Sequence, residues 1–366
     1  MKRKIKYIAG IIVCLVVVLF GGNEIIKNNE NLDGNSTNIT ESSNALVNTN
    51  VTNDSGNLKI YFIDVGQADS ILIEQNGKFM LIDAGNNDDG DLVVNYLKQK
   101  GVTKLDYVIG THAHEDHIGG MDDVIKYFDE EKILFSKVTA TTKTFEDFAN
   151  AVKSKDKKLY APKSGETFEF ANSSFEVLAP NSQNYDSANN YSIVIKIKFG
   201  NKSFLFTGDA EDVSEKEMID KGLDLKADVL KVGHHGSSSS STDAFLDAVK
   251  PQYAVISVGK NNDYGHPHKE TMDILKEKSI EIHRSDECGD IVFTSTGNGL
   301  EADCKKGSYN TGANSKYNKT ENTVKTESNT YEKDSEYKLD NYKELFTGYI
   351  FNSIDGNETG KITDNT

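Results

Sequence analysis

Cysteine, tryptophan and basic charge are all scarce in this 366-residue sequence. It has three cysteines, no tryptophan, and 41 Lys and Arg residues against 57 Asp and Glu residues. Three scattered cysteines do not make a zinc cluster. The middle segment, residues 58–304, carries 27 basic and 42 acidic side chains, which excludes a broad basic surface for duplex DNA. An anionic ligand would have to be held locally, by metal ions and a few lysines.

Long apolar runs are lacking as well. The N-terminal run from Tyr7 to Phe20 has the length of a signal-peptide core and is short for a membrane-spanning helix. Four basic residues precede it (Lys2, Arg3, Lys4 and Lys6). Because no small-residue cleavage pattern follows, we expect an uncleaved signal anchor in residues 1–26, with a cleaved signal peptide as the alternative. Either form exports the rest of the chain, which would then be extracellular on the cell membrane or secreted.

The remaining composition divides the chain into a linker, a domain and a tail. Residues 27–57 are rich in Asn, Ser and Thr, which is typical of a polar linker. From Leu58 to Cys304, short apolar runs alternate with helical patterns, which predicts one mixed α/β domain. Residues 305–366 are predicted to form a polar, largely disordered tail. Its one apolar island, Tyr342–Ile354, could dock on the domain or bind a partner.

Helical spacing and strand-like runs locate the elements of this domain. About a dozen short strands are expected, each bounded by turn residues. Helices are expected at 91–100, 119–128, 213–221, 242–249 and 269–278. Cys288 and Cys304 flank a predicted hairpin, and in an exported protein they could form a disulfide. Two half-buried free thiols are the open alternative.

Seven of the eight histidines fall in three short clusters. The first is the run THAHEDHIGG, which follows a predicted strand. His112 and His114 are two residues apart, so both point to the same side of an extended chain. Asp116 and His117 come where a helix is expected to begin, so they can serve a second ion beside the first. Imidazole and carboxylate ligands suit zinc, manganese or iron.

Three other predicted strands end in residues that can join this site. FLFTGDAE places Asp209 after a glycine, where its carboxylate can bridge two cations. VLKVGHHGSSSSST supplies His234 or His235 to bind a substrate oxygen or protonate a leaving group, and its serines and glycine amides could hold an anion. YGHPH supplies His266, held between Gly265 and Pro267, as a further metal ligand, and His268 as a helix cap or a solvated residue.

These motifs, in this order, resemble the metallo-β-lactamase superfamily. DVGQADSILIE, LIDAG, THAHEDHIGG, NNYSIVIKI, FLFTGDAE, VLKVGHHGS and YGHPH are similar, more narrowly, to the hydrolase domain of ComEC-type competence proteins. The resemblance spans Leu58 to about Cys304. It implies an α/β fold, the αββα four-layer sandwich, with a metallo-hydrolase site at the sheet edge. The channel segments of that family are missing, and one short apolar run cannot make a DNA-uptake pore.

The resemblance also implies a ligand set for two divalent metal ions, zinc or manganese. His112 and His114 would bind one ion, Asp116 and His117 the other, and Asp209 both. His266 would complete the Asp116 and His117 ion. Asp83 would be the carboxylate that orients the histidine ligands. The supporting or substrate-contacting candidates are Gln67, Asn190 and Ser237.

One departure concerns a histidine that many superfamily members place between HxHxDH and the bridging Asp. No histidine lies between His117 and His234 in this sequence. Asn190, in NNYS, is expected near that place. The His112 and His114 ion would then be weakly held, or be manganese rather than zinc.

The expected activity is an exported, metal-dependent phosphodiesterase or nuclease. The metals would lower the pKa of a bridging water, and the hydroxide would attack phosphorus, with Asp116, His234 and His235 as catalytic groups. A site without cysteine ligands favours phosphoesters, and the acidic domain favours single-stranded DNA or a small substrate. No protein partner is predicted, and the membrane is contacted only through the anchor. A cell-wall phosphocholine esterase is the alternative, although such enzymes carry Trp-rich repeats; a non-catalytic surface binding module is the third hypothesis.

Overall fold

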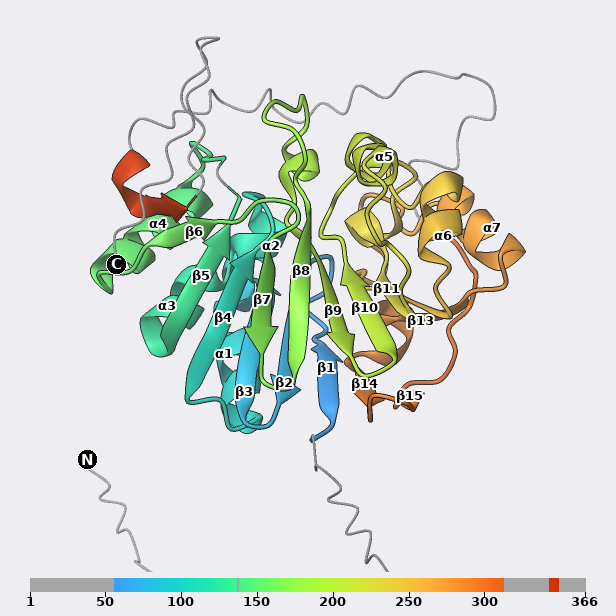
Figure 1. Cartoon of the computed structure of the whole chain (residues 1–366), viewed down its shortest axis with the longest axis horizontal. Coiled ribbons are helices and arrows are strands. Elements are labelled where there is room, and N and C mark those ends of the chain that lie inside the picture. The colour runs from blue at the N-terminus through green and yellow to red at the C-terminus, as the bar shows by residue number, and fades with distance from the viewer. Residues whose placement is uncertain (1–55, 137, 313–341, 349–366) are drawn as a thin grey trace, which may run out of the picture. The chain divides into compact units, whose positions relative to one another are not determined.

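Two β-sheets pack face to face and carry helices on their outer faces in the computed structural model (Figure 1). The structure describes residues 56–136, 138–312 and 342–348. This arrangement confirms the expected αββα architecture. The signal anchor and most of the linker lie outside the described residues. Within the described ranges, no helix combines the length and the apolar character that crossing a membrane requires.

The first sheet has nine strands in the order β15–β14–β1–β2–β3–β4–β5–β6–β16. They are β1 (Leu58–Phe62), β2 (Ser70–Gln75), β3 (Lys78–Ala84), β4 (Lys104–Gly110), β5 (Asp129–Phe135), β6 (Leu159–Ala161), β14 (Ile291–Ser295), β15 (Leu300–Ala302) and β16 (Phe346–Gly348). The second sheet has seven strands in the order β13–β12–β11–β10–β9–β8–β7. They are β7 (Thr167–Phe170), β8 (Ser173–Ala179), β9 (Val194–Phe199), β10 (Lys202–Phe206), β11 (Val229–Lys231), β12 (Tyr253–Ile256) and β13 (Glu281–Arg284).

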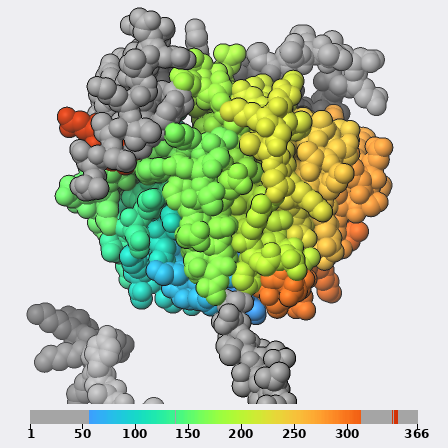
Figure 2. All heavy atoms as spheres, in the orientation of Figure 1, coloured from blue at the N-terminus to red at the C-terminus, as the bar shows by residue number. Residues whose placement is uncertain are grey.

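Helices cover the outer face of each sheet. The longer ones over the first sheet are α1 (Gly90–Gln99), α3 (Met121–Tyr127) and α4 (Lys143–Ser154), and those over the second are α5 (Asp212–Asp220), α6 (Asp243–Val249) and α7 (Lys269–Glu277) (Figure 1). Two short helices, α2 (Glu115–Ile118) and α8 (Ser285–Cys288), stand at strand ends. In the space-filling view, the green middle of the chain lies between the blue and cyan first part and the orange last part (Figure 2).

Alternating side chains build three hydrophobic layers. Ile60 and Phe62 of β1 face the layer between the two sheets, whereas Tyr61 faces the helices over the first sheet. A third layer joins the second sheet to its helices and includes Leu205 and Phe245. Because both faces of each sheet are covered, most strand residues are buried, which explains the nearly continuous apolar runs of the sequence.

Two parts of the helical prediction differ from the structure. The expected helix 119–128 is shorter, because α3 runs from Met121 to Tyr127, and an unexpected short helix, α2, precedes it and ends at Ile118. A Cβ on Gly119 would lie 2.1 Å from the backbone carbon of Asn86, so only glycine permits this close approach. Helix α4 was not expected, although Phe145, Phe148 and Val152 carry the required spacing and are fully buried.

The parallel strands of each sheet end at one common edge. β3, β4 and β5 are parallel in the first sheet, and β10, β11, β12 and β13 are parallel in the second. The segments that follow β3, β4, β10, β11 and β12 contain most of the candidate site residues. The topology therefore gathers short motifs that lie far apart in the sequence.

Part of the C-terminal apolar island docks on the first sheet. β16 pairs in parallel with β6, and Leu345 and Phe346 are buried in the layer that contains Phe145 of α4. The Tyr342 ring meets the Phe145 ring edge-on. Residues 313–341 and 349–366 of the expected tail lie outside the described residues.

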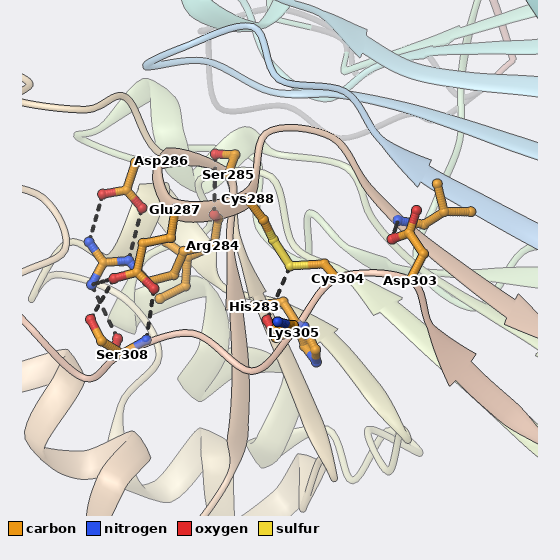
Figure 3. The surroundings of a disulfide bond; sticks show 12 residues. His283, Arg284, Ser285, Asp286, Glu287, Cys288, Asp303, Cys304, Lys305 and Ser308 are labelled. Atoms are coloured by element: carbon orange, nitrogen blue, oxygen red, sulfur yellow. Dashed lines mark hydrogen bonds and ion pairs between the residues drawn. A yellow bond between two sulfur atoms is a disulfide. The ribbon is translucent and has the colours of Figure 1, made fainter.

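Cys288 and Cys304 form a disulfide that closes a loop over 16 positions (Figure 3). Beside it, the Arg284 guanidinium forms a bidentate pair with Asp286, at 2.9 and 2.8 Å, and donates to the carbonyl oxygens of Ser308 and Asn310. The Ser308 amide also donates to Glu287. The disulfide and Arg284 together fasten the chain that follows β15 to the second sheet.

Removal of this disulfide should lower stability. A cross-link over a loop of this length stabilises a fold by about 3 kcal/mol, because it restricts the unfolded chain. We expect the Cys288→Ser/Cys304→Ser variant to unfold at lower temperature than the wild type in the absence of reductant, and at the same temperature in its presence. The Cys14→Ser variant is the control that keeps the bond. Equal melting of both variants without reductant would contradict the stabilising role.

Candidate metal centre

The candidate ligands converge at the shared edge of the two sheets. Asp83 is the last residue but one of β3, the first histidines follow β4, Asp209 follows β10, and the His234–His235 pair follows β11. Four residues bring one ligand atom each to within 4.8 Å of one another: Asp116, His117, Asp209 and His235. Their donor atoms are nitrogen and oxygen, which suits a divalent transition metal.

The distances within this four-residue cluster show where its side chains point. His117 Nε2 lies 3.3 Å from Asp209 Oδ1 and 3.8 Å from Asp116 Oδ2. His235 Nε2 lies 3.2 Å from Asp116 Oδ2 and 3.8 Å from Asp209 Oδ2. The two imidazoles therefore face the same pair of carboxylates.

Hydrogen bonds on the far side fix the orientation of both imidazoles. His117 Nδ1 lies 2.7 Å from Asp83 Oδ2, and Asp83 also accepts from the amide and the hydroxyl of Thr111. His235 Nδ1 lies 2.9 Å from the carbonyl oxygen of Ser257. Since a carboxylate and a carbonyl accept, each Nδ1 carries a proton, and Nε2 is the nitrogen of each ring that faces the cluster.

The cluster fits a cation. His117 Nε2 and Asp209 Oδ1 are buried atoms without a hydrogen-bond partner in the described part of the chain. Three carboxylates, those of Asp69, Asp83 and Asp209, are buried here, and Lys231 pairs with that of Asp69. Buried charge of one sign is costly unless an opposite charge compensates it, which a divalent ion would do.

The electrostatics of the cluster are coupled. Burial opposes the charge on Asp209, but His117, His234 and His235 outweigh burial and hold the pKa of Asp209 well below its ordinary value. Burial lowers the pKa of His117, but Asp209, Asp116 and Asp83 together raise it well above its ordinary value. The Asp209 carboxylate thus stays ionised and attracts positive charge.

His112 and His114 form a second meeting point beside the first. His112 Nε2 lies 3.0 Å from His114 Nδ1, as the spacing of the two residues predicts. The other nitrogen of His112 lies 3.1 Å from Thr111 Oγ1 and 3.3 Å from Ser192 Oγ. Ser192 was not a sequence candidate, although it lies in the quoted NNYSIVIKI motif; its hydroxyl also accepts from the Asp209 amide.

Asn190 lies near Ser192, but its side chain forms hydrogen bonds at the start of helix α5. Its Oδ1 accepts from the amides of Glu211 and Ser214, and its Nδ2 donates to Glu211. It holds the N-terminus of α5 beside Asp209.

The His234–His235 pair adopts an unusual backbone. His234 has φ 49° and His235 has φ 52°, both in the left-handed region that non-glycine residues rarely adopt. Such strain persists where the surroundings enforce it, and it is common at functional sites.

Glu215 holds the loop that follows the histidine pair, since it accepts from the amide and the hydroxyl of Thr242 at 2.9 and 2.7 Å.

His266 lies on the wall of the pocket, outside the four-residue cluster. Its Nδ1 lies 3.2 Å from Gln67 Nε2, and Gln67 Oε1 accepts from the Gly259 amide. This fixes the Gln67 amide as the donor to Nδ1, so His266 carries its proton on Nε2. Burial, then His234, His235 and His268, lower the pKa of His266 to about 2, so the ring is neutral. The pocket is lined by Gln67, His114, Glu115, Asp116, Asp209, His234, His235, Tyr264 and His266.

His234 also lines the pocket, whereas Ser237 supports the loop behind it. His234 Nε2 lies 3.7 Å from Asp209 Oδ2, and its Nδ1 lies 3.1 Å from Ser239 Oγ. The Ser237 hydroxyl bonds the Ser239 hydroxyl at 3.0 Å and is buried. His268 accepts from the Ser238 amide through Nδ1, so it holds the serine loop against the start of α7.

A buried ion pair beneath the cluster was missed in the sequence. Lys231, the last residue of β11, places its ammonium group 2.8 Å from Asp69 Oδ2, and both side chains are almost fully buried. Asp69 Oδ1 lies 3.6 Å from His235 Nδ1, and its amide donates to the carbonyl of Asp116. The available signals were Asp69 within the quoted DVGQADSILIE motif and a lysine at the end of an otherwise apolar strand.

Comparison with known proteins gives one family. A sequence model described as the metallo-beta-lactamase superfamily matches residues 63–260, more than half of the chain. The matched segment contains all four residues of the cluster. The family predicted from the motifs is therefore confirmed.

Curated relatives support the narrower resemblance. ComE operon protein 3 of Bacillus subtilis is 33% identical over 254 residues, 64% of this chain and 33% of the relative. Recombination protein 2 of Haemophilus influenzae is 31% identical over 218 residues, 58% of this chain and 26% of the relative. Competence protein ComA of Neisseria gonorrhoeae is 30% identical over 241 residues, which are 65% of this chain and 32% of the relative. The chain thus spans about a third or less of each relative's length.

Two solved structures match about two thirds of this chain at low sequence identity. The metallo-beta-lactamase fold protein YhfI of Bacillus subtilis is 15% identical, with a TM-score of 0.42 over 66% of this chain and 100% of that chain. A diphosphatase of the PhnP family is 16% identical, with a TM-score of 0.39 over 65% of this chain and 99% of that chain.

The buried ion pair predicts a stability effect. In the Lys231→Met variant, Asp69 would remain buried without its partner, and loss of one member of such a pair costs about 3–5 kcal/mol. We expect a lower urea midpoint for the variant, and recovery of most of the loss in the Asp69→Asn/Lys231→Met double variant. The Lys216→Met variant, which breaks an exposed pair with Asp220, is the control. Equal urea midpoints for Lys231→Met and this control would rule out a stabilising role for the Asp69–Lys231 ion pair.

Proposed function

Because the chain belongs to the metallo-beta-lactamase superfamily, we propose that it is a metal-dependent phosphodiesterase acting on single-stranded nucleic acid. The observation that carries the proposal is the cluster of Asp116, His117, Asp209 and His235 at the base of an open pocket. The family includes metal-dependent hydrolases, and the cluster contains the side chains that would bind a divalent ion.

The structure favours His235 as the residue that completes the Asp116 and His117 site. Its Nε2 faces both carboxylates, whereas His266 lies on the pocket wall with one nitrogen bound to Gln67. We therefore assign His235 to the metal and His266 to the substrate. His112 and His114 would hold the second ion, with Asp209 shared between the two.

When bound, zinc or manganese would acidify a water and polarise the phosphoryl oxygens. The residues of this chain would then orient the reacting groups. Asp83 and Ser257 bind Nδ1 of His117 and His235, so that Nε2 of each ring is turned toward the ion. His266 offers an N–H to a phosphoryl oxygen, and His234, beside Asp209, is placed to protonate the leaving oxygen.

Two observations support a single-stranded nucleic acid as the substrate. One relative is named a recombination protein and another a competence protein, and recombination acts on DNA. The domain is acidic, and its pocket lining includes no Lys or Arg, which disfavours a duplex held by many phosphate contacts. The donor set lacks cysteine, which favours phosphoesters over β-lactams.

The proposed enzyme would act outside the cell. The basic residues before Tyr7 and the apolar run to Phe20 support a signal anchor, and the disulfide between Cys288 and Cys304 suits an oxidising compartment. We therefore propose that the anchor holds the domain on the outer side of the cell membrane.

Cleavage of a labelled single-stranded oligonucleotide by the purified full chain tests the proposal. We expect cleavage with Mn²⁺, none with a chelator, and slower cleavage of the matching duplex. The Asp209→Asn variant should lose about 100-fold or more of the rate, because the shared ligand is weakened. The Asp220→Asn variant, altered at an exposed site on α5, should cleave normally. Absence of metal-dependent cleavage, or full activity of Asp209→Asn, would refute the proposal.

A further inference from the structure

Tyr264 presents an exposed aromatic ring at the rim of the metal pocket. It lines the pocket, and 53% of its surface is accessible. The large exposed apolar side chains among the described residues are Leu92, Tyr127, Val213 and Tyr264. Of these, Tyr264 alone lines the pocket, and Tyr127 is covered by the Lys98 ammonium at 3.7 Å from its ring.

The loop that carries Tyr264 is held rigidly by one side chain. Asn262 Oδ1 accepts from the amides of Tyr264 and His266, at 3.1 and 3.0 Å. Asn262 Nδ2 donates to the carbonyls of Gly259 and His266, at 2.9 and 2.7 Å. Four bonds from one amide close this loop, so the Tyr264 backbone has a fixed position.

The ring itself rests on a second ring. Tyr264 and His266 are stacked, with centroids 5.6 Å apart and planes inclined by 21°. His266 is fixed in turn by Gln67, which also accepts from the Gly259 amide. This platform, formed by the Tyr264 and His266 rings, is therefore ordered before a ligand arrives. Little conformational entropy is lost when another flat group stacks on it.

The charge around the platform excludes one kind of ligand. Glu115 and Asp116 line the same pocket, and Asp263 precedes Tyr264 in the sequence. Phosphates beyond the one at the metal centre would be repelled here. A neutral planar ring gains from stacking without that penalty, and every nucleobase has such a face.

We propose that Tyr264 stacks on the nucleobase next to the scissile phosphate and so makes the enzyme depend on a base rather than on the phosphodiester alone. This inference rests on the proposed phosphodiesterase function. Tyr264 acts as a specificity residue: it binds the base, and the cluster of Asp116, His117, Asp209 and His235 serves the phosphate.

The absence of tryptophan allows a direct binding test in the full chain. In the Tyr264→Trp variant, the introduced indole is the one strong fluorophore. We expect thymidine 5′-monophosphate to quench it at about tenfold lower concentration than 2-deoxyribose 5-phosphate, which has the phosphate but no base. The Tyr127→Trp variant, exposed to a similar degree outside the pocket, is the matched control and should not respond.

Kinetics on oligothymidylate provide the second readout. We expect Tyr264→Ala to raise KM about tenfold with little change in kcat, and Tyr264→Phe to retain the wild-type values, because the ring face and not the hydroxyl makes the contact. An oligonucleotide that is abasic beside the scissile phosphate should remove the difference between wild type and Tyr264→Ala.

The outcomes separate this inference from the proposed function. Base-dependent quenching without any cleavage would support the stacking site and refute the phosphodiesterase. Cleavage that ignores both Tyr264→Ala and the abasic position would overturn the stacking site alone. Quenching by phosphocholine but not by thymidine 5′-monophosphate would overturn it as well, and would show that the ring binds a cation instead.

Discussion

The buried ion pair between Asp69 and Lys231 joins the two sheets directly beneath the metal cluster. Asp69 precedes β2 of the first sheet, and Lys231 ends β11 of the second. The backbone amide of Asp69 also holds Asp116, and its carboxylate stands beside the Nδ1 atom of His235. Each sheet supplies part of the ligand set, so the distance between the two halves of the site depends on this pair.

The sandwich brings the candidate ligands to one edge, in the segments that follow its strands, and hydrogen bonds then set the direction of His117, His235 and His266. Asp83 turns His117 inward, Ser257 turns His235 inward, and Gln67 holds His266 at the wall. The result is a base of carboxylates and imidazoles for a cation, with an aromatic rim above it. The proposed substrate would place one phosphate at the base of the pocket and a flat ring at its rim.

The sequence predicts the part of this account that depends on local pattern. The fold class follows from alternating runs, and His112, His114, Asp116, His117 and Asp209 follow from their places directly after strands. The proposed assignment of His235 rather than His266 to the metal could not be predicted from the sequence, because the left-handed backbone at His234 and His235 redirects adjacent side chains. Lys231 resembles an ordinary strand residue until its cross-sheet partner is known. The pairing of β16 with β6 joins segments about 190 residues apart, and no local pattern encodes it.

The position of a bound ion is the most direct test of the central claim. Anomalous diffraction from a crystal of the chain soaked in Mn²⁺ would locate it without reference to activity. The account predicts a peak among the inward atoms of Asp116, His117, Asp209 and His235, with Gln67 still bound to His266. A peak ligated by His266 in place of His235, or no peak within the cluster, would contradict it.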